Sequence, residues 1–199
     1  DDKDKDGEAT GRLIADDVKG IIFLSVFPAK FVKGIGRKKL PVTFFNSPVN
    51  AQEYIRIGDV INVEGFYSMN ALTDYVIRQK GCTKFAYIGF AEGSRMIQAR
   101  YLGFLNACSQ NHVQLDDRLQ YTCPANSVGY SYAMVEEVVK NMPYIPEAIV
   151  CEDDDVAKHV SLALLQRDPH AVKRVVITGF NNTLETDFFK KDILTVEVR

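Results

Sequence analysis

The feature that most constrains the fold is an alternation of short apolar runs with longer amphipathic stretches along the 199 residues. The short runs are rich in β-branched and aromatic residues, which predicts strands, and several are apolar throughout, as strands covered on both faces are. We expect strands at residues 19–25, 41–46, 59–63, 84–90, 119–122, 148–151 and 174–178.

The longer stretches carry apolar residues at three- and four-residue spacing, which is typical of amphipathic helices. We expect helices at residues 67–80, 94–110, 127–141 and 154–166. Ser94, Ser127 and Asp154 stand at their starts, where a short polar side chain can cap free backbone N–H groups. Strands that alternate with helices predict βαβ units and a mostly parallel sheet, so the fold class is α/β.

The composition excludes several functions. The 24 basic and 26 acidic residues are mixed along the chain, and the formal net charge of -2 does not favour DNA binding by this chain itself. The run KGIGRKK at residues 33–39 lacks the third glycine of a dinucleotide-binding loop, so it indicates a solvated helix end. No apolar run reaches the length of a membrane span. The four cysteines form no C-x-x-C pair, which indicates reduced thiols in the cytoplasm.

Polar and aromatic residues follow the predicted strands, at the carboxyl edge where open α/β sheets bind ligands. This mixture suits a small polar ligand such as a sugar. The residues are Ser25, Phe27, Phe45, Asn46, Glu64, Phe90–Ser94, Pro124–Ser127, Glu152–Asp155 and Phe180–Asn182. Arg100 lies in the helix predicted at 94–110, where it is either a surface residue or a guanidinium that offers forked donors to a ligand.

We predict no catalytic residue, metal site or cofactor, because the chain has no G-x-S-x-G motif and no paired spacing of Cys and His. One alternative stays open, since Glu152–Asp155 follow a strand and could hold magnesium for phosphotransfer. In the favoured interpretation the four acids have separate roles. Asp153 accepts from a ligand hydroxyl with Asn181 as its counterpart, Asp154 and Asp155 occupy a helix N-terminus, and Glu152 lies on a solvated rim.

Several segments together resemble the sensor domain of lactose/galactose-repressor-type (LacI/GalR) transcriptional regulators. KGCTKFAYIG at 80–89 resembles the family pattern KGHKRIAYIG, and RYLGFLNA at 100–107 resembles RLxGFxxA. VITGFNN at 176–182 and LTV at 194–196 resemble VVGFDD and LTTV. The runs KGIIFLS at 19–25 and LPVTFFNSP at 40–48 resemble the third and fourth strands of that family.

The resemblance implies a periplasmic-binding-protein-like I fold with two doubly wound parallel-sheet lobes. Residues 1–64 would form a partial N-terminal lobe, 65–181 the C-terminal lobe and 182–199 a return crossover toward the N-terminal lobe. Glu64, Gly65 and Asn182 would lie at the hinge. The first strands of the fold and a DNA-binding helix-turn-helix would precede Asp1, and a last helix and strand would follow Arg199.

By position, the resemblance favours Arg100 as a ligand contact and adds Asn46, Asp153 and Asn181. The full set expected to bind ligand is Ser25, Phe27, Asn46, Ser94, Arg100, Asp153 and Asn181. The chain departs from the family pattern, because Asp153 stands where relatives have asparagine and Asn181 where they have aspartate. The effector therefore cannot be copied from a relative.

The resulting hypothesis is the effector-binding and dimerisation part of a cytoplasmic transcriptional regulator, such as a repressor. A sugar-like effector would close the lobes of a homodimer and control operator DNA binding by the helix-turn-helix. One alternative is a solute-binding protein of a sugar transporter, which shares the fold. The other is the magnesium-dependent acid-cluster enzyme.

Overall fold

The computed structural model describes residues 14, 17–123, 130–183 and 193–198. These residues divide into two units. The first consists of the described part of Asp1–Val63 together with Gly93–Met96, and the second of Glu64–Glu92 together with the described part of Ile97–Arg199. Each unit has its own parallel β-sheet.

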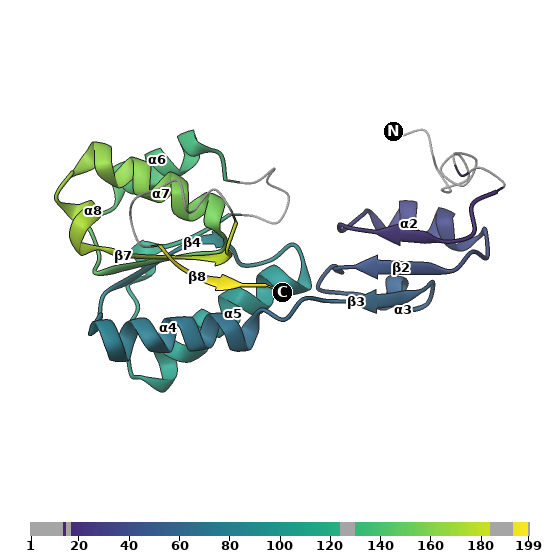
Figure 1. The fold of residues 1–199 in the computed structure, drawn as a ribbon, viewed down its shortest axis with the longest axis horizontal. Helices are drawn as coiled ribbons and strands as arrows, with labels where there is room; N and C mark the ends of the chain where they lie inside the picture. Colours follow the sequence, from purple (N-terminus) through teal and green to yellow (C-terminus); the bar gives the residue numbers. More distant parts are fainter. Residues whose placement is uncertain (1–13, 15–16, 124–129, 184–192, 199) are drawn as a thin grey trace. The chain divides into compact units, whose positions relative to one another are not determined.

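The first unit is a three-stranded sheet in the order β1-β2-β3, with strands β1 (Ile21–Phe23), β2 (Val42–Phe45) and β3 (Asp59–Ile61). Helices α2 (Ala29–Gly36) and α3 (Gln52–Ile55) follow the first two strands (Figure 1). Their buried side chains pack on one face of the sheet in a core of Phe23, Val32, Ile35, Val42, Phe44 and Tyr54. The opposite face carries Ile22, Phe45 and Ile61, which are exposed.

The second unit contains a five-stranded parallel sheet in the order β5-β4-β6-β7-β8. Its strands are β4 (Phe85–Phe90), β5 (Gln120–Cys123), β6 (Ala148–Cys151), β7 (Val176–Asn181) and β8 (Leu194–Glu197). The helices are α4 (Phe66–Lys80), α5 (Arg95–Gln110), α6 (Tyr132–Asn141), α7 (Asp154–Arg167) and α8 (Ala171–Arg174), and a 3₁₀ turn spans Asp117–Leu119.

Helices cover both faces of this sheet, with α4 and α5 on one side and α6, α7 and α8 on the other (Figure 1). Alternate residues of β4 explain why its run is apolar throughout. Ala86 and Ile88 pack with the α6 and α7 side, whereas Phe85 and Tyr87 pack with the α4 and α5 side. A strand buried on both faces has no place for a polar residue, so the periodicity of two disappears.

The α/β fold class is confirmed, and so are the seven predicted strands and four predicted helices, with shifted ends. The run at 33–39 contains the end of α2, as predicted. Within the segment predicted as a return crossover, residues 182–199, Leu194–Glu197 pair with β7 and extend the sheet of the second unit, while the return toward the first unit stays a prediction. None of the described helices has the length and apolar character that spanning a bilayer requires.

Two predicted helix caps differ in the structure. Helix α7 is capped by Asp153 rather than Asp154, because the Asp153 carboxylate accepts a hydrogen bond from the Val156 N–H. Helix α6 begins at Tyr132 and is capped by Ser131, while the predicted cap Ser127 lies outside the described residues. Ser94 directly precedes α5, at the predicted position.

Candidate functional site

Arg100 occupies the centre of a polar cluster at the carboxyl edge of the five-stranded sheet. It lies on α5 and is only 3% exposed. Its Nη1 donates to the carbonyl oxygen of Glu152 at 2.8 Å, and its Nη2 donates to Oδ1 of Asn181 at 3.2 Å. The guanidinium carbon lies 3.9 Å from the ring centroid of Phe180, a cation–π distance. The structure therefore excludes the surface alternative for Arg100.

The charge of Arg100 is balanced by nearby carboxylates. Burial lowers the pKa of the guanidinium, and the charges of Asp153 and Glu152 oppose that shift. Arginine stays protonated in proteins even when its pKa falls somewhat. The cluster therefore holds a permanent forked donor, which can recognise hydroxyl, carbonyl or carboxylate oxygens.

Glu152 is buried, with 6% exposure, so the predicted solvated rim position is wrong. The carboxylate accepts a hydrogen bond from the Phe90 N–H at the end of β4. Gly89 makes room for it, because a Cβ there would lie 2.6 Å from the Cβ of Glu152. Burial raises the pKa of Glu152 to about 7, although the Phe90 hydrogen bond and the nearby Arg100 favour the charged form.

Asp153 is half-buried and serves as the N-cap of α7, with Oδ1 2.9 Å from the Val156 nitrogen. Burial raises its pKa, and the hydrogen bond to Val156 opposes the shift. The carboxylate also interacts electrostatically with Arg100. Its predicted role as an acceptor for a ligand hydroxyl stays a prediction.

Asp154 is also buried, with 2% exposure, and its side chain does not cap α7 as predicted. Its two oxygens accept from the Thr183 N–H at 2.8 Å and from the Thr195 hydroxyl at 2.6 Å. Asp155 is exposed in the first turn of α7, where the helix dipole favours a negative charge.

The three buried or half-buried acids thus accept hydrogen bonds from backbone N–H groups of three different segments. A shared magnesium ion would need their oxygens to converge. Across the described ranges, no group of three or more His, Cys, Asp or Glu side chains is placed to hold a metal ion. The acid-cluster enzyme stays an alternative prediction.

Asn181 ends β7 with a φ of 97°, and Asn182 follows with a φ of 51°. Both angles lie in the left-handed region, which asparagine tolerates better than other residues with a side chain. The Asn182 N–H donates to the Thr195 hydroxyl at 3.3 Å. This turn directs the Asn181 side chain to Arg100, so the structure brings together three predicted ligand-binding residues: Arg100, Asp153 and Asn181.

The other four predicted ligand-binding residues, Ser25, Phe27, Asn46 and Ser94, belong to the first unit. Ser25 is exposed and Ser94 is buried. Phe27 packs against Phe23 with ring centroids 5.0 Å apart, and its backbone is held by the Tyr54 hydroxyl. Asn46 has a φ of 80°, and its buried Oδ1 has no hydrogen-bond partner within the described part of the chain.

The predicted hinge residues Glu64 and Gly65 lie where the chain leaves the first unit. The Glu64 carboxylate accepts from the N–H groups of Tyr67 and Ser68, in the first turn of α4. Burial opposes ionisation of Glu64, but hydrogen bonds from Ser68 and Tyr67 hold its pKa below the usual value. Gly65 is the N-cap position of the same helix.

The sequence reasoning missed the anchoring of Asp154 and the burial of Glu152. Both depend on glycines on neighbouring strands. Gly89 adjoins Glu152, and a Cβ at Gly179 would lie 2.2 Å from Oδ1 of Asp154. A glycine inside a buried strand, together with acids that directly follow another strand of the sheet, is the signal that points to such a site.

Residues 76–199, more than half of the chain, match the family described as the periplasmic binding protein-like domain. The chain belongs to this family. The chain is 24% identical over 196 residues to the catabolite control protein A of Staphylococcus aureus (strain MRSA252). The aligned residues make up 98% of the chain and 57% of that protein. The chain thus spans a little over half the length of this curated relative.

Solved structures share the fold of this periplasmic binding protein-like chain. The transcription regulator CcpA of Lactococcus lactis has a TM-score of 0.77 at 18% identity, covering 100% of the chain and 70% of that structure. A LacI family transcriptional regulator from Lactobacillus casei with bound glucose has a TM-score of 0.73 at 18% identity, and the match covers 95% of the chain and 69% of that structure.

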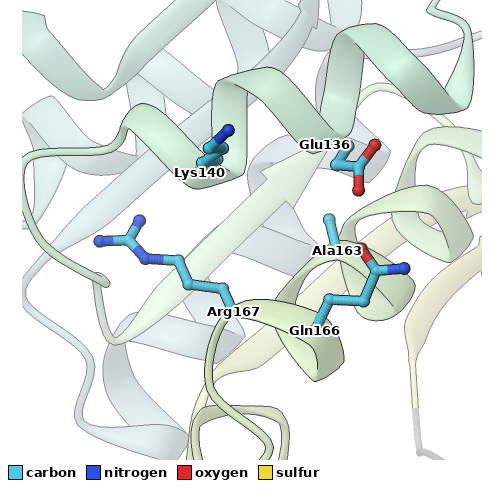
Figure 2. A pocket seen from close by; sticks show the side chains of 5 residues that line it. All are labelled: Glu136, Lys140, Ala163, Gln166 and Arg167. Carbon is cyan, nitrogen blue, oxygen red and sulfur yellow. The ribbon is translucent and has the colours of Figure 1, made fainter.

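A separate pocket of about 200 Å³ lies between α6 and α7, lined by Glu136, Lys140, Ala163, Gln166 and Arg167 (Figure 2). The Arg167 guanidinium donates to the carbonyl oxygens of Val139 and Met142 at the end of α6. This pocket shares no lining residue with the Arg100 cluster.

Proposed function

We propose that this chain is the effector-binding and dimerisation part of a LacI-type transcriptional regulator. The observation that carries the proposal is the buried Arg100 guanidinium, held between Glu152 and Asn181 at the carboxyl edge of a parallel sheet. This edge is where open α/β sheets bind small ligands. The solved structures whose names describe transcription regulators favour this role over a transporter's solute-binding protein.

The proposed effector is a small polar molecule rich in hydroxyl groups, such as a sugar. Arg100 supplies donors, while Asp153 and Asn181 supply oxygens that accept from hydroxyls. The glucose bound to the regulator from Lactobacillus casei supports this class of ligand. From the first unit we propose Ser25, Phe27, Asn46 and Ser94 as further contacts. The strongest of them is Asn46, whose Oδ1 has no hydrogen-bond partner among the residues that the structure describes.

The proposed mechanism is a shift between two arrangements of the units. The chain passes between the units at Val63 and Glu64, and Glu64, Gly65 and Asn182 form the proposed hinge. An effector that binds one arrangement more tightly raises its population by that difference in affinity. In a cytoplasmic homodimer this shift would change how two helix-turn-helix domains of the longer protein meet operator DNA. The chain itself performs no reaction in this account.

The test combines calorimetry with a DNA-binding assay on the full-length protein. We expect at least one compound from a panel of sugars, sugar phosphates and nucleobases to bind saturably and to change operator affinity. The Arg100→Lys variant should lose both effects, because lysine cannot span two acceptors. Binding without any change in operator affinity would instead support the solute-binding alternative.

A further inference from the structure

Beyond Arg100, a second set of polar groups, arranged around the buried carboxylate of Asp154, joins three segments of the second unit. Asp154 in the first turn of α7 accepts from the Thr183 N–H at 2.8 Å and from the Thr195 hydroxyl of β8 at 2.6 Å. The Asn182 N–H donates to the same Thr195 hydroxyl oxygen at 3.3 Å. We call Asp154, Asn182, Thr183 and Thr195 the Asp154 latch.

The chain is built to admit this carboxylate. Asp154 is 2% exposed, and a buried carboxylate is costly unless donors satisfy it. Gly179 on β7 leaves the space, because a Cβ there would lie 2.2 Å from Oδ1 and 3.1 Å from the Cα of Asp154. A residue with any side chain at 179 would displace the aspartate.

The latch lies directly after the residue that meets Arg100. Asn181 and Asn182 both have positive φ angles, a conformation that persists only where surrounding contacts hold it. The latch binds the N–H groups of the two residues that follow Asn181, so it fixes the path of this turn. The direction of the Asn181 side chain, and hence its 3.2 Å bond to Arg100, depends on that path.

We propose that Asp154 is a positioning residue of the effector site, which holds Asn181 in place for Arg100 and the ligand. This inference rests on the proposed function for its ligand. The hydrogen bonds of the latch also run to β8, which resides in the same sheet as β7. A change at Thr195 therefore reaches the site both through Asp154 and through the Asn182 N–H.

Conservative variants remove hydrogen bonds of the Asp154 latch with little change in side-chain size, so they test the positioning role separately from packing. Asp154→Asn keeps the size but replaces one acceptor oxygen by a donor, so it can accept from Thr183 or from Thr195 but not through two oxygens. Thr195→Val removes the hydroxyl at nearly constant shape, and Thr195→Ser restores it. Asp155→Asn is the matched control, because Asp155 is exposed on the same helical turn.

The first readout does not need a ligand. In ¹⁵N NMR spectra of the full chain we expect Asp154→Asn and Thr195→Val to shift or broaden the Asn181 side-chain amide and Arg100 guanidinium signals. We also expect the Thr183 amide to exchange with solvent at least tenfold faster. Thr195→Ser and Asp155→Asn should resemble the wild type.

The second readout is the dissociation constant for D-glucose, or for whichever sugar of a defined panel the wild type binds, where we expect a roughly tenfold loss in the first two variants. Unchanged Asn181 and Arg100 signals in folded Thr195→Val protein overturn the positioning role, even if Asp154→Asn fails to fold. A wild type that binds no sugar instead overturns the effector proposal, while the NMR comparison still decides the role of Asp154.

Discussion

Nη2 of Arg100 lies 3.2 Å from Oδ1 of Asn181, which joins helix α5 to the last residue of strand β7. The same guanidinium reaches the carbonyl oxygen of Glu152 through Nη1 at 2.8 Å. A single planar fork thus connects the turn after β6 with the turn after β7. Arg100 thus links the ends of β6 and β7 at the carboxyl edge of the second sheet.

Replacing Arg100 by lysine should damage both stability and binding. A lysine ammonium cannot reach two acceptors in fork geometry, so one buried acceptor loses its partner. We expect the free energy of unfolding in urea to fall by about 2 kcal/mol and effector affinity to fall at least tenfold. Arg78→Lys is the control, since Arg78 is an exposed arginine paired with Asp74 on α4. Equal behaviour of the two variants would contradict the role of Arg100.

Glu152→Gln should change how stability depends on pH. Burial raises the pKa of Glu152 from 4.5 to about 7. Between these values the folded protein holds a proton that the unfolded chain has released, so the free energy of unfolding falls as pH rises from 4.5 to about 7. This shift corresponds to about 3 kcal/mol at most. Glutamine resembles the protonated acid. The free energy of unfolding of Glu152→Gln should therefore match that of the wild type near pH 4.5 and exceed it above about pH 7.

Glu147→Gln provides a control of opposite sign. Hydrogen bonds from the Thr83 and Lys84 N–H groups hold the pKa of Glu147 below its usual value. Its contribution to stability is present above the unfolded-state pKa and is lost as pH falls through the folded-state value. The Glu147→Gln variant should therefore be less stable than the wild type at neutral pH and approach it in acid. Urea denaturation across a range of pH measures the free energy of unfolding of both variants. If this free energy depended on pH in the same way in Glu152→Gln and in the wild type, the raised pKa of Glu152 would be refuted.

Much of the fold could be predicted from the sequence because local patterns encode it. The run FAYIGF of β4 is apolar throughout since helices cover both faces, and the amphipathic helices repeat apolar residues with helical spacing. The short helices α3 and α8 were not predicted, because four residues are too few to show a period. Leu194–Glu197 were matched to a family motif but were not predicted as a strand of the second sheet.

The site was less predictable because its geometry depends on distant partners. The burial of Glu152 requires Phe90 and Gly89, which lie more than 60 residues earlier. The anchoring of Asp154 requires Thr183 and Thr195, which lie 29 and 41 residues later. A run of four acids shows the charge but not which oxygen meets which donor. The burial of Arg100 likewise depends on Glu152 and Asn181, which lie 52 and 81 residues later.

Asp153 should show separable roles in folding and binding. Asp153→Ala removes the N-cap of α7, which typically costs about 1 kcal/mol of stability, and it also removes the proposed acceptor for a ligand hydroxyl. Asp153→Asn keeps a good capping residue but removes the charge near Arg100. We expect Asp153→Asn to unfold in urea within about 0.5 kcal/mol of the wild type. Calorimetry should show weaker effector binding in both variants, and full affinity in Asp153→Ala would place the ligand elsewhere.

Gly103→Ala should loosen the packing of α5 on α4. A Cβ at this position would lie 2.3 Å from the Phe66 carbonyl oxygen and 3.1 Å from the Asn70 nitrogen. Overpacking against backbone costs about 1–3 kcal/mol, which outweighs the roughly 1 kcal/mol that alanine gains over glycine in a helix. Ser109→Ala, at an exposed position of the same helix, should be nearly neutral. A Gly103→Ala protein as stable as the wild type in urea would show that α4 and α5 are further apart.

The most direct test is isothermal titration of the full-length protein with the panel of sugars, sugar phosphates and nucleobases, repeated with Arg100→Lys and Asn181→Ala. We predict one saturable site for a hydroxyl-rich compound, with affinity lowered at least tenfold by either substitution, because the buried Arg100 guanidinium and the Asn181 side chain form one hydrogen-bonded pair. No binding by any compound, or binding that neither substitution changes, would contradict the assignment of this cluster as the effector site.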